Sequence, residues 1–204
     1  MNTLIEALQQ RFGEHRVSDF PLLDENDVGL IQVDLELRSK VTLLMTNGLH
    51  KYKMPVPEKL EEFAHAELYF CLPSYWELAM DNEKFNWVYF QLQKLAKHLI
   101  DQQTWFGVGH TFSNGKPPQA LSSTMKQNHL LLTEPILLEE ALDKIVVDDK
   151  SITFLAVVPI FDEEFEFKMA QGYFKFIRKF RGKNNEETLD DFRESVKKRR
   201  FGLF

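Results

Sequence analysis

The sequence predicts an α+β domain with a mostly antiparallel sheet and helices packed on the faces of that sheet. Several apolar stretches that suit strands are separated by loops, which favours antiparallel pairing. Helical periodicity appears between and after the later strands. The 204 residues are 44% hydrophobic, which is enough to bury a sizeable core. We therefore expect a single domain over residues 1–204.

The first half of the chain is predicted to contain one helix and three strands. Apolar positions recur at three and four over residues 3–12, and Gly13 ends that helix. Residues 29–38 alternate apolar and polar side chains, the period of a strand with one dry and one wet face. Two further strands are expected over residues 41–46 and 65–73.

A loop is predicted between the second and third of these strands. Asn47-Gly48 signals a turn, and Pro55 and Pro57 are incompatible with regular strand pairing. Pro73 ends the strand that follows the loop. The segment is therefore expected to carry no regular secondary structure.

Glu67 lies on one face of the third strand, together with Tyr69 and Cys71. If this carboxylate is buried, it must be hydrogen-bonded or paired with a cation. The alternative is a half-solvated face on which the glutamate sits in water, and this is the arrangement we expect. Cys71 is expected to be a small core residue.

The middle of the chain is predicted to contain a long helix. An apolar stripe at helical spacing covers residues 84–103, and Asp81 or Asn82 is expected to cap its start. Glycine, serine and paired prolines over residues 112–123 indicate an extended surface loop. A short strand is expected around residues 130–132, with one helical turn as an alternative for the LLEEAL segment that follows.

The last third of the chain is predicted to hold a central strand followed by two helices. Residues 151–161 are apolar on both faces and rich in β-branched side chains, which is typical of a strand covered above and below. Aromatic residues at helical spacing predict one helix over residues 163–181. A second helix is expected over 187–198, before a basic tail. The phenylalanines of this region cannot all face one side of a helix, so some are expected to be exposed as an anchor patch.

Charge and cysteine content limit the partners of the protein. The net charge of −6 and a pI of about 5.6 disfavour binding to nucleic acid and to anionic membranes. The single cysteine, Cys71, excludes an intramolecular disulfide. Neither a signal peptide nor an apolar run of roughly 18 residues is visible. We therefore expect a cytoplasmic protein whose partner is another protein.

Common catalytic and cofactor motifs are missing from the sequence. There is no glycine-rich phosphate loop, no HExxH, no CxxC and no GxSxG. The six histidines lack the spacing of metal ligands. They are His15, His50, His65, His98, His110 and His129. No metal or cofactor is predicted.

His110, in the stretch TWFGVGHT, is the strongest single candidate for chemistry. A general base needs an orienting partner, and the sequence near His110 supplies none. The alternative is that its ring pins the loop after the long helix. The acidic segment over residues 162–167 also has two interpretations: a solvated helix face, or a docking surface for a basic partner.

Five segments in order resemble the suppressor-of-fused domain family. They read VTLLMTNGLHKYKMPVP, AELYFCLPSYW, NWVYFQLQKLAKHL, TWFGVGHTFSNGKPP and ITFLAVVPIFDEEFEF, and they span about residues 40–180. Their order and spacing match the family pattern. The positions that carry this pattern are Gly48, Pro55, Glu67, Pro73, Trp76, Trp105, Gly109, His110, Thr111 and Pro159.

This resemblance implies a compact α+β domain with a non-enzymatic, protein-binding role. Animal members are larger and hold zinc-finger transcription factors of Hedgehog signalling in the cytoplasm, a role that we do not transfer to this shorter chain. Stand-alone bacterial members are associated with polymorphic toxin systems as immunity proteins. The resemblance implies the same role here, and a basic toxin domain would suit the acidic charge. A general interaction or regulatory scaffold is the alternative.

Two further hypotheses follow from the residues themselves. The first is an enzyme that uses His110, with Glu67 or another acid as the orienting partner. It requires these side chains to converge in a pocket. The second is a structural subunit that self-associates through the phenylalanine-rich helix. The oligomeric state is open at this point.

Overall fold

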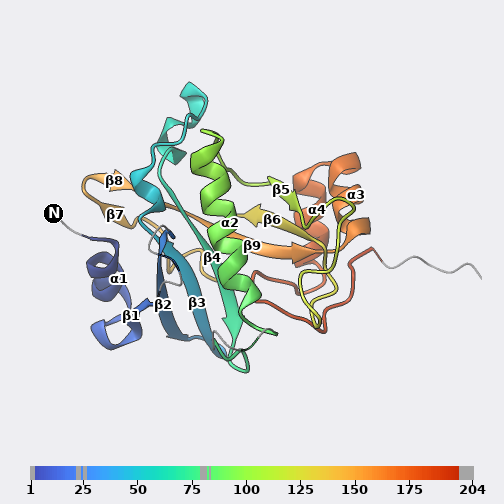
Figure 1. The fold of residues 1–204 in the computed structure, drawn as a ribbon, viewed down its shortest axis with the longest axis horizontal. Helices are drawn as coiled ribbons and strands as arrows, with labels where there is room; N and C mark the ends of the chain where they lie inside the picture. The colour runs from blue at the N-terminus through green and yellow to red at the C-terminus, as the bar shows by residue number, and fades with distance from the viewer. Residues whose placement is uncertain (1–2, 22–23, 25–26, 79–81, 83, 198–204) are drawn as a thin grey trace, which may run out of the picture.

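The protein is built around a twisted sheet, as seen in a computed structural model that describes residues 3–21, 24, 27–78, 82 and 84–197 (Figure 1). Within these residues a seven-stranded sheet has the order β1-β2-β3-β4-β9-β6-β5. Its strands are β1 (Val17–Phe20), β2 (Gly29–Glu36), β3 (Lys40–Asn47), β4 (Ala66–Pro73), β5 (Thr111–Ser113), β6 (His129–Thr133) and β9 (Thr153–Ile160). All neighbours are antiparallel except β4 and β9. The predicted α+β class is confirmed.

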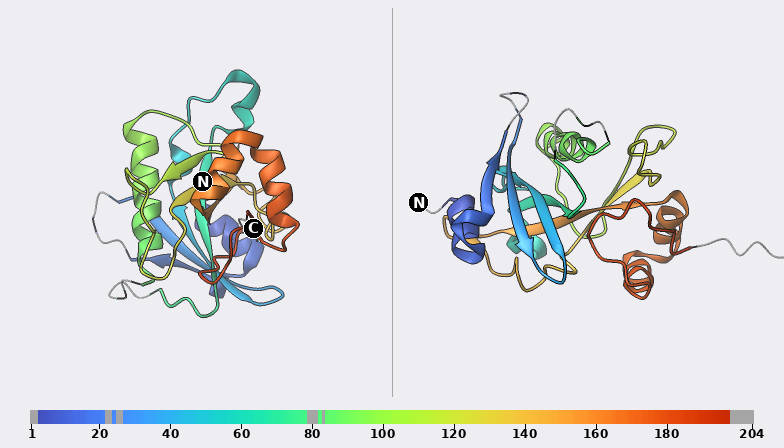
Figure 2. Two further views of the ribbon diagram at one scale, coloured as in Figure 1. Left: turned by 90° about the vertical axis from the view of Figure 1, so that its right-hand side faces the viewer. Right: turned by 90° about the horizontal axis from the view of Figure 1, so that it is seen from below.

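Helices cover both faces of the sheet. The α-helices are α1 (Leu4–Phe12), α2 (Trp87–Asp101), α3 (Asp162–Gln171) and α4 (Tyr173–Arg181). Figure 2 shows α2 on one face and the α3–α4 pair on the other. Short 3-10 helices are η1 (Glu14–Arg16), η2 (Leu49–Lys51) and η3 (Glu58–Phe63), and a small hairpin joins β7 (Val146–Val147) to β8 (Lys150–Ser151).

Two hydrophobic cores follow from the alternation of side chains along the strands. On β4, Leu68 and Phe70 pack under α2, whereas Tyr69 and Cys71 pack on the opposite side against α1 and α4 residues. The central strand β9 contributes to both cores and is buried from Phe154 onward. The predicted central strand is therefore confirmed, although Ser151 belongs instead to β8 and Ile152 lies between the two strands.

The C-terminal segment is extended. We call residues 186–197 the strap. The strap lies beside the end of β4, where Thr188 forms a parallel bridge with Cys71 and the Leu189 amide donates to the Cys71 carbonyl at 2.8 Å. β4 pairs with β9 only up to Tyr69, so the strap occupies the place beside β4 that β9 leaves. The predicted helix is wrong for residues 187–197, because their buried side chains and several of their amides bond to distant segments, and the contacts among them are isolated turns without a helical ladder.

The predicted helix over 163–181 is divided in two. Gly172 has a φ of +85°, a conformation outside the right-handed helical region, and it ends α3 and begins α4. Within α4, Phe176 and Phe180 are buried, whereas Phe174 is exposed, so the phenylalanines of this helix do not share one face.

Three smaller predictions also need correction. The long helix begins at Trp87, and its cap residue Asn86 makes no side-chain cap; Asn82 instead accepts from the Lys84 amide at 3.2 Å within the preceding turn. Asp81 lies outside the described residues. The loop after β3 contains η2 and η3, and β5 lies in a segment predicted to be loop.

Candidate functional site

The TWFGVGHT stretch forms a tight turn that attaches β5 to the sheet. The Gly109 amide donates to the Leu132 carbonyl at 2.8 Å, and the Leu132 amide donates back to the His110 carbonyl at 2.9 Å. Gly109 has a φ of +87°, and a Cβ there would lie 3.2 Å from the Tyr173 side chain. The turn therefore requires glycine both for its conformation and for its close approach to α4.

The His110 ring packs against Trp105, with ring centroids 4.5 Å apart. Partial burial lowers the pKa of His110, and the positive charge of Lys168 lowers it further. Within the described part of the chain, no acidic side chain is hydrogen-bonded to this ring. The ring thus stiffens the turn, and the geometry does not supply the orienting acid that a general base requires.

Glu67 is fully buried, so the expectation of a half-solvated face is wrong. Its carboxylate accepts from the Thr46 hydroxyl, from the Gly48 amide at 2.9 Å and from the His50 amide at 3.1 Å. The His50 Nδ1 lies 2.5 Å from the same carboxylate. These donors hold the turn after β3, in which Gly48 has a φ of +112°. Glu67 is therefore occupied by this turn and does not partner His110.

The remaining motif positions are dispersed over the fold. Trp76 is buried between the end of β4 and α2, and its Nε1 donates to the Phe85 carbonyl at 3.3 Å. Pro73 ends β4, Pro159 is buried in β9, and Pro55 is exposed in the loop after β3. The structure brings Trp105, Gly109, His110 and Thr111 together and joins Gly48 to Glu67. Across the described residues, the ten positions do not form one pocket.

His129, which the sequence did not single out, links β5 to α3. Its buried ring lies 3.0 Å from the Ser113 hydroxyl at Nδ1 and 2.9 Å from the Asp162 carboxylate at Nε2. A nucleophilic serine also needs donors that stabilise an oxyanion. The neighbouring donors are already used, because the Asn114 backbone and side-chain amides donate to carbonyls of the following loop. This contact therefore positions β5 and α3.

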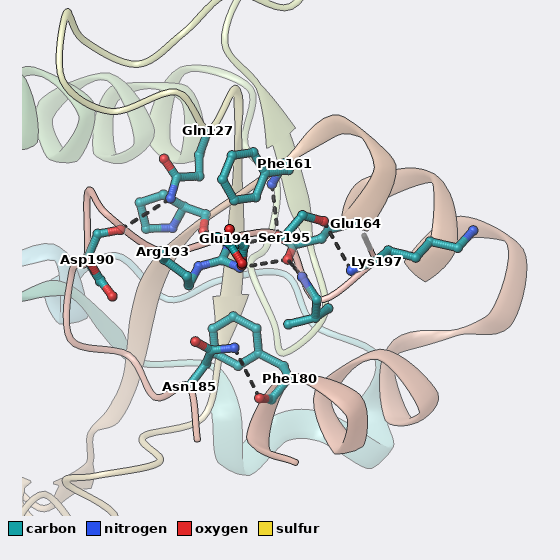
Figure 3. A network of polar contacts seen from close by, with 12 residues as sticks. Gln127, Phe161, Glu164, Phe180, Asn185, Asp190, Arg193, Glu194, Ser195 and Lys197 are labelled. Carbon is teal, nitrogen blue, oxygen red and sulfur yellow. Dashed lines mark hydrogen bonds and ion pairs between the residues drawn. The ribbon is translucent and has the colours of Figure 1, made fainter. Parts of the chain in front are cut away.

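A buried ion pair fastens the strap, and sequence reasoning missed it. Arg193 donates to both oxygens of Glu164 at 2.6 and 2.8 Å, and its guanidinium lies between the rings of Phe161 and Phe180 (Figure 3). Glu164 also accepts from the Val196 amide at 2.8 Å. The only sequence signal was an acid three residues after Phe161, a position that reaches back to the start of a helix.

A second buried carboxylate anchors the other end of the strap. Glu187 accepts from the amides of three consecutive residues, Ile136, Leu137 and Leu138, at 3.1, 2.7 and 3.1 Å. The Tyr69 hydroxyl donates to it at 3.2 Å. Burial raises the pKa of Tyr69, and the Glu187 charge raises it further. Both ends of the strap are thus held by carboxylates that are desolvated and fully bonded.

Strand β5 lies at an edge of the sheet. The backbone N–H and C=O groups of its successive residues point alternately toward β6 and away from it. Asn114 donates to Asn128, and Leu132 donates to His110, so residues 110, 112 and 114 turn their backbone groups toward β6. Thr111 and Ser113 therefore turn theirs outward, where the Ser113 carbonyl accepts from the Gly115 amide at 3.0 Å and the two amides point away from β6. A cavity of about 460 Å³ beside this edge is lined by α2 and β5 residues, among them Lys94 and His98.

Metal-binding clusters and membrane-spanning helices are both absent from the part of the chain that the structure describes. No cluster of three or more histidine, cysteine, aspartate or glutamate side chains has the arrangement of a metal site. No helix there has both the length and the apolar character needed to cross a membrane.

Taken together, these features define an α+β domain whose motif residues shape turns and a sheet edge. The sequence profile of the suppressor of fused protein family matches residues 24–194. The chain therefore belongs to the suppressor of fused family, as the five segments had indicated. Comparison with curated proteins by sequence returned no match.

Solved structures show the same fold at low sequence identity. A crystal structure from Neisseria gonorrhoeae, assigned as a suppressor of fused homolog, is 16% identical with a TM-score of 0.69, and the match covers 95% of this chain and 94% of that one. A chain of the Sufu-Fu complex is also 16% identical, with a TM-score of 0.66 and coverages of 95% and 90%. Drosophila Suppressor of Fused is 17% identical, with a TM-score of 0.65, and the match covers 95% of this chain and 50% of that one.

Proposed function

We propose that this protein is a binding domain that takes an extended segment of a protein partner as an additional strand on β5. The observation that carries this proposal is the outward orientation of the Thr111 and Ser113 backbone at an edge of the sheet. An open strand edge is a template for main-chain hydrogen bonds from another chain. The crystallised Sufu-Fu complex supports a protein-binding role for the family.

Amide hydrogen exchange tests this proposal within a single strand. A partner isolated by cross-linking in the native cell is purified and added to the protein. We expect the Ser113 and Thr111 amides to gain protection in the complex. The Phe112 amide, which already faces β6, should change little and serves as the internal control. Protection confined to other segments would show that the partner binds elsewhere.

We further propose that the partner is a basic toxin domain, so that the protein acts as an immunity protein. The support is the net charge of −6 together with acidic side chains gathered at α3, since opposite potentials speed association and favour the correct partner. Co-expression with the product of the neighbouring gene tests this. The protein should restore growth of cells that make the toxin, and an absence of rescue by a well-expressed protein would reject the role.

A further inference from the structure

A groove lies between α3 and the strap, on a different part of the surface from the β5 edge. The cavity measures about 950 Å³. We call it the α3–strap groove. Its lining comes from the loop before β6, from the start of α3 and from the strap, and comprises Thr124, Lys126, Phe161, Asp162, Glu163, Glu166, Asp191, Phe192, Arg193, Glu194 and Ser195.

An exposed aromatic side chain stands at the border of the groove. Phe192 is 82% exposed, the highest fraction among the large hydrophobic side chains that the structure describes. Its position is fixed by its neighbours. Asp191 accepts from the Tyr75 hydroxyl at 2.7 Å, and Arg193 is held by Glu164. The Tyr75 ring lies 6.5 Å from the Phe192 ring. An exposed apolar side chain between two anchored residues has the properties of a binding anchor.

The charge of the groove is strongly negative. Five carboxylates line it, from two separate elements, against the cations Lys126 and Arg193. The Arg193 charge is already paired with Glu164. Acids in the first turn also stabilise a helix through its dipole, which explains Asp162 and Glu163 without a ligand. Asp191 is on the strap and Glu166 is in the second turn, so helix stabilisation does not explain them.

A second hollow, of about 760 Å³, lies on the other side of the strap and has a different charge. Phe192 lines both hollows. The second one contains Lys179 and Lys183 from the region of α4 together with Asp190 and Glu194 from the strap, so its charges are close to balanced. A positively charged ligand is therefore attracted more strongly to the α3 side of Phe192 than to the α4 side.

We propose that the α3–strap groove binds a segment of a protein partner that is rich in lysine and arginine and carries an aromatic residue among them. Carboxylates on α3 and the strap would pair with the cations, while the exposed ring of Phe192 would stack on a guanidinium or on the partner's aromatic side chain. The inference is independent of strand addition at β5, since the two surfaces use different residues.

The chain contains a segment of the same chemistry in its own sequence. Residues 198–204 read KRRFGLF, which combines three cations with two phenylalanines. A test must therefore distinguish a partner's segment from this one. Both the full chain and a chain that ends at Lys197 are used for that purpose.

The experiment measures fluorescence anisotropy of a labelled peptide, GRKFRRFG, against the full chain. A peptide in which glutamate replaces each basic residue serves as the probe control. The double variant Glu163→Lys and Glu166→Lys reverses charge in the groove. Its matched control, Glu139→Lys and Glu140→Lys, changes the net charge equally at two exposed residues outside the lining of the groove.

We expect the basic peptide to bind and the acidic peptide not to bind. The groove variant should lose roughly tenfold or more in affinity, and Phe192→Ala a similar factor, as is typical of a binding anchor. The Glu139 and Glu140 variant should stay within about twofold of the wild type. Circular dichroism and unfolding curves confirm that each variant is folded.

Two results would overturn the proposal. Equal losses in the groove variant and in its matched control would show that the peptide responds only to net charge. Binding that appears only in the chain ending at Lys197 would show that residues 198–204, and not a partner, supply the segment for this groove. These two outcomes do not depend on strand addition at β5, because hydrogen exchange at Thr111 reports on that surface separately.

Discussion

Glu67 and Glu164 are both buried carboxylates, yet they stabilise different kinds of structure. Glu67 is bonded to the Thr46 hydroxyl and to donors of the turn after β3, all within 21 residues along the chain. Glu164 faces the guanidinium of Arg193, 29 residues away. A local carboxylate with mostly neutral donors thus shapes a turn, whereas a paired carboxylate fastens a whole segment. The difference shows that burial alone does not define the role of an acid; its donors do.

Breaking the Glu164 pair is expected to have the largest effect on stability. Glu164→Ala leaves Arg193 buried without its counter-charge, which typically costs about 3–5 kcal/mol. Urea unfolding measures this loss. Replacing both residues by methionine should recover much of the stability, because no unpaired charge then remains. A single variant that loses less than about 1 kcal/mol would show that the pair is effectively solvated.

Cys71 offers a second measurement on the same variant. Burial raises the pKa of its thiol to about 12, and the thiol lies 3.4 Å from the Thr188 hydroxyl on the strap. In the wild type we expect almost no alkylation of this cysteine at pH 8, since the thiolate is the reactive form. If Glu164→Ala detaches the strap, the rate of alkylation should rise under native conditions. An unchanged rate would show that the substitution does not detach the strap from Cys71.

Removing Glu67 should have a smaller but still large effect. Glu67→Ala leaves the Gly48 and His50 amides without an acceptor, at a cost of about 2–3 kcal/mol. Because the effect is local to the turn after β3, the alkylation rate of Cys71 should change only in proportion to global unfolding. This contrast separates a turn carboxylate from a strap carboxylate. Equal rates of Cys71 alkylation in Glu67→Ala and Glu164→Ala would contradict this difference between the two carboxylates.

Replacing His110 is expected to lower the free energy of unfolding moderately, by an amount that depends on pH. His110→Ala removes the ring contact with Trp105 and should lower stability by about 1–2 kcal/mol. The folded state lowers the pKa of His110, so the unfolded state takes up the proton first as the pH falls. Its contribution is therefore present above about pH 6.5 and lost below it. The wild type should lose stability between pH 7 and pH 5 more steeply than His110→Gln. A variant of native stability that fails to bind its partner would instead assign His110 to the interface.

Phe192→Ala is expected to have the smallest effect on stability. The side chain is almost fully exposed, so the change should stay within about 0.5 kcal/mol. Its effect should appear in peptide binding alone. Thermal unfolding of this variant, compared with that of Glu164→Ala, then separates the strap as a structural element from the strap as a binding surface. A loss above about 1 kcal/mol would mean that Phe192 is packed in solution.

Local patterns predicted much of the fold. The alternation in residues 29–36 and the helical spacing in residues 4–12 depend on near neighbours, and both elements formed as expected. The order of the five family segments identified the family correctly. Gly172 was also a local signal, and it was overlooked because the aromatic spacing on either side continued as if the helix were unbroken.

The candidate site was predictable only in part. The turn that contains Gly109 and His110 was correctly placed after the long helix, but the edge strand that follows it was not, because three residues carry too little periodicity. Exposure of some phenylalanines in the last third of the chain was predicted, and Phe174 is exposed. The exposure of Phe192 was not predicted, because that residue was assigned to a helix.

By itself, the sequence determined the acidic charge, the family and those helices and strands whose periodicity is long and regular, because each depends on residue type and near spacing. Only the tertiary structure decided which acids are buried and what they hold. Glu187 meets the amides of residues 136–138 after β9, α3 and α4 have intervened along the chain, and Arg193 meets Glu164 after the chain has passed through α4. The cost of burying a charge is offset only when distant donors converge on it, and that convergence is a property of the assembled fold.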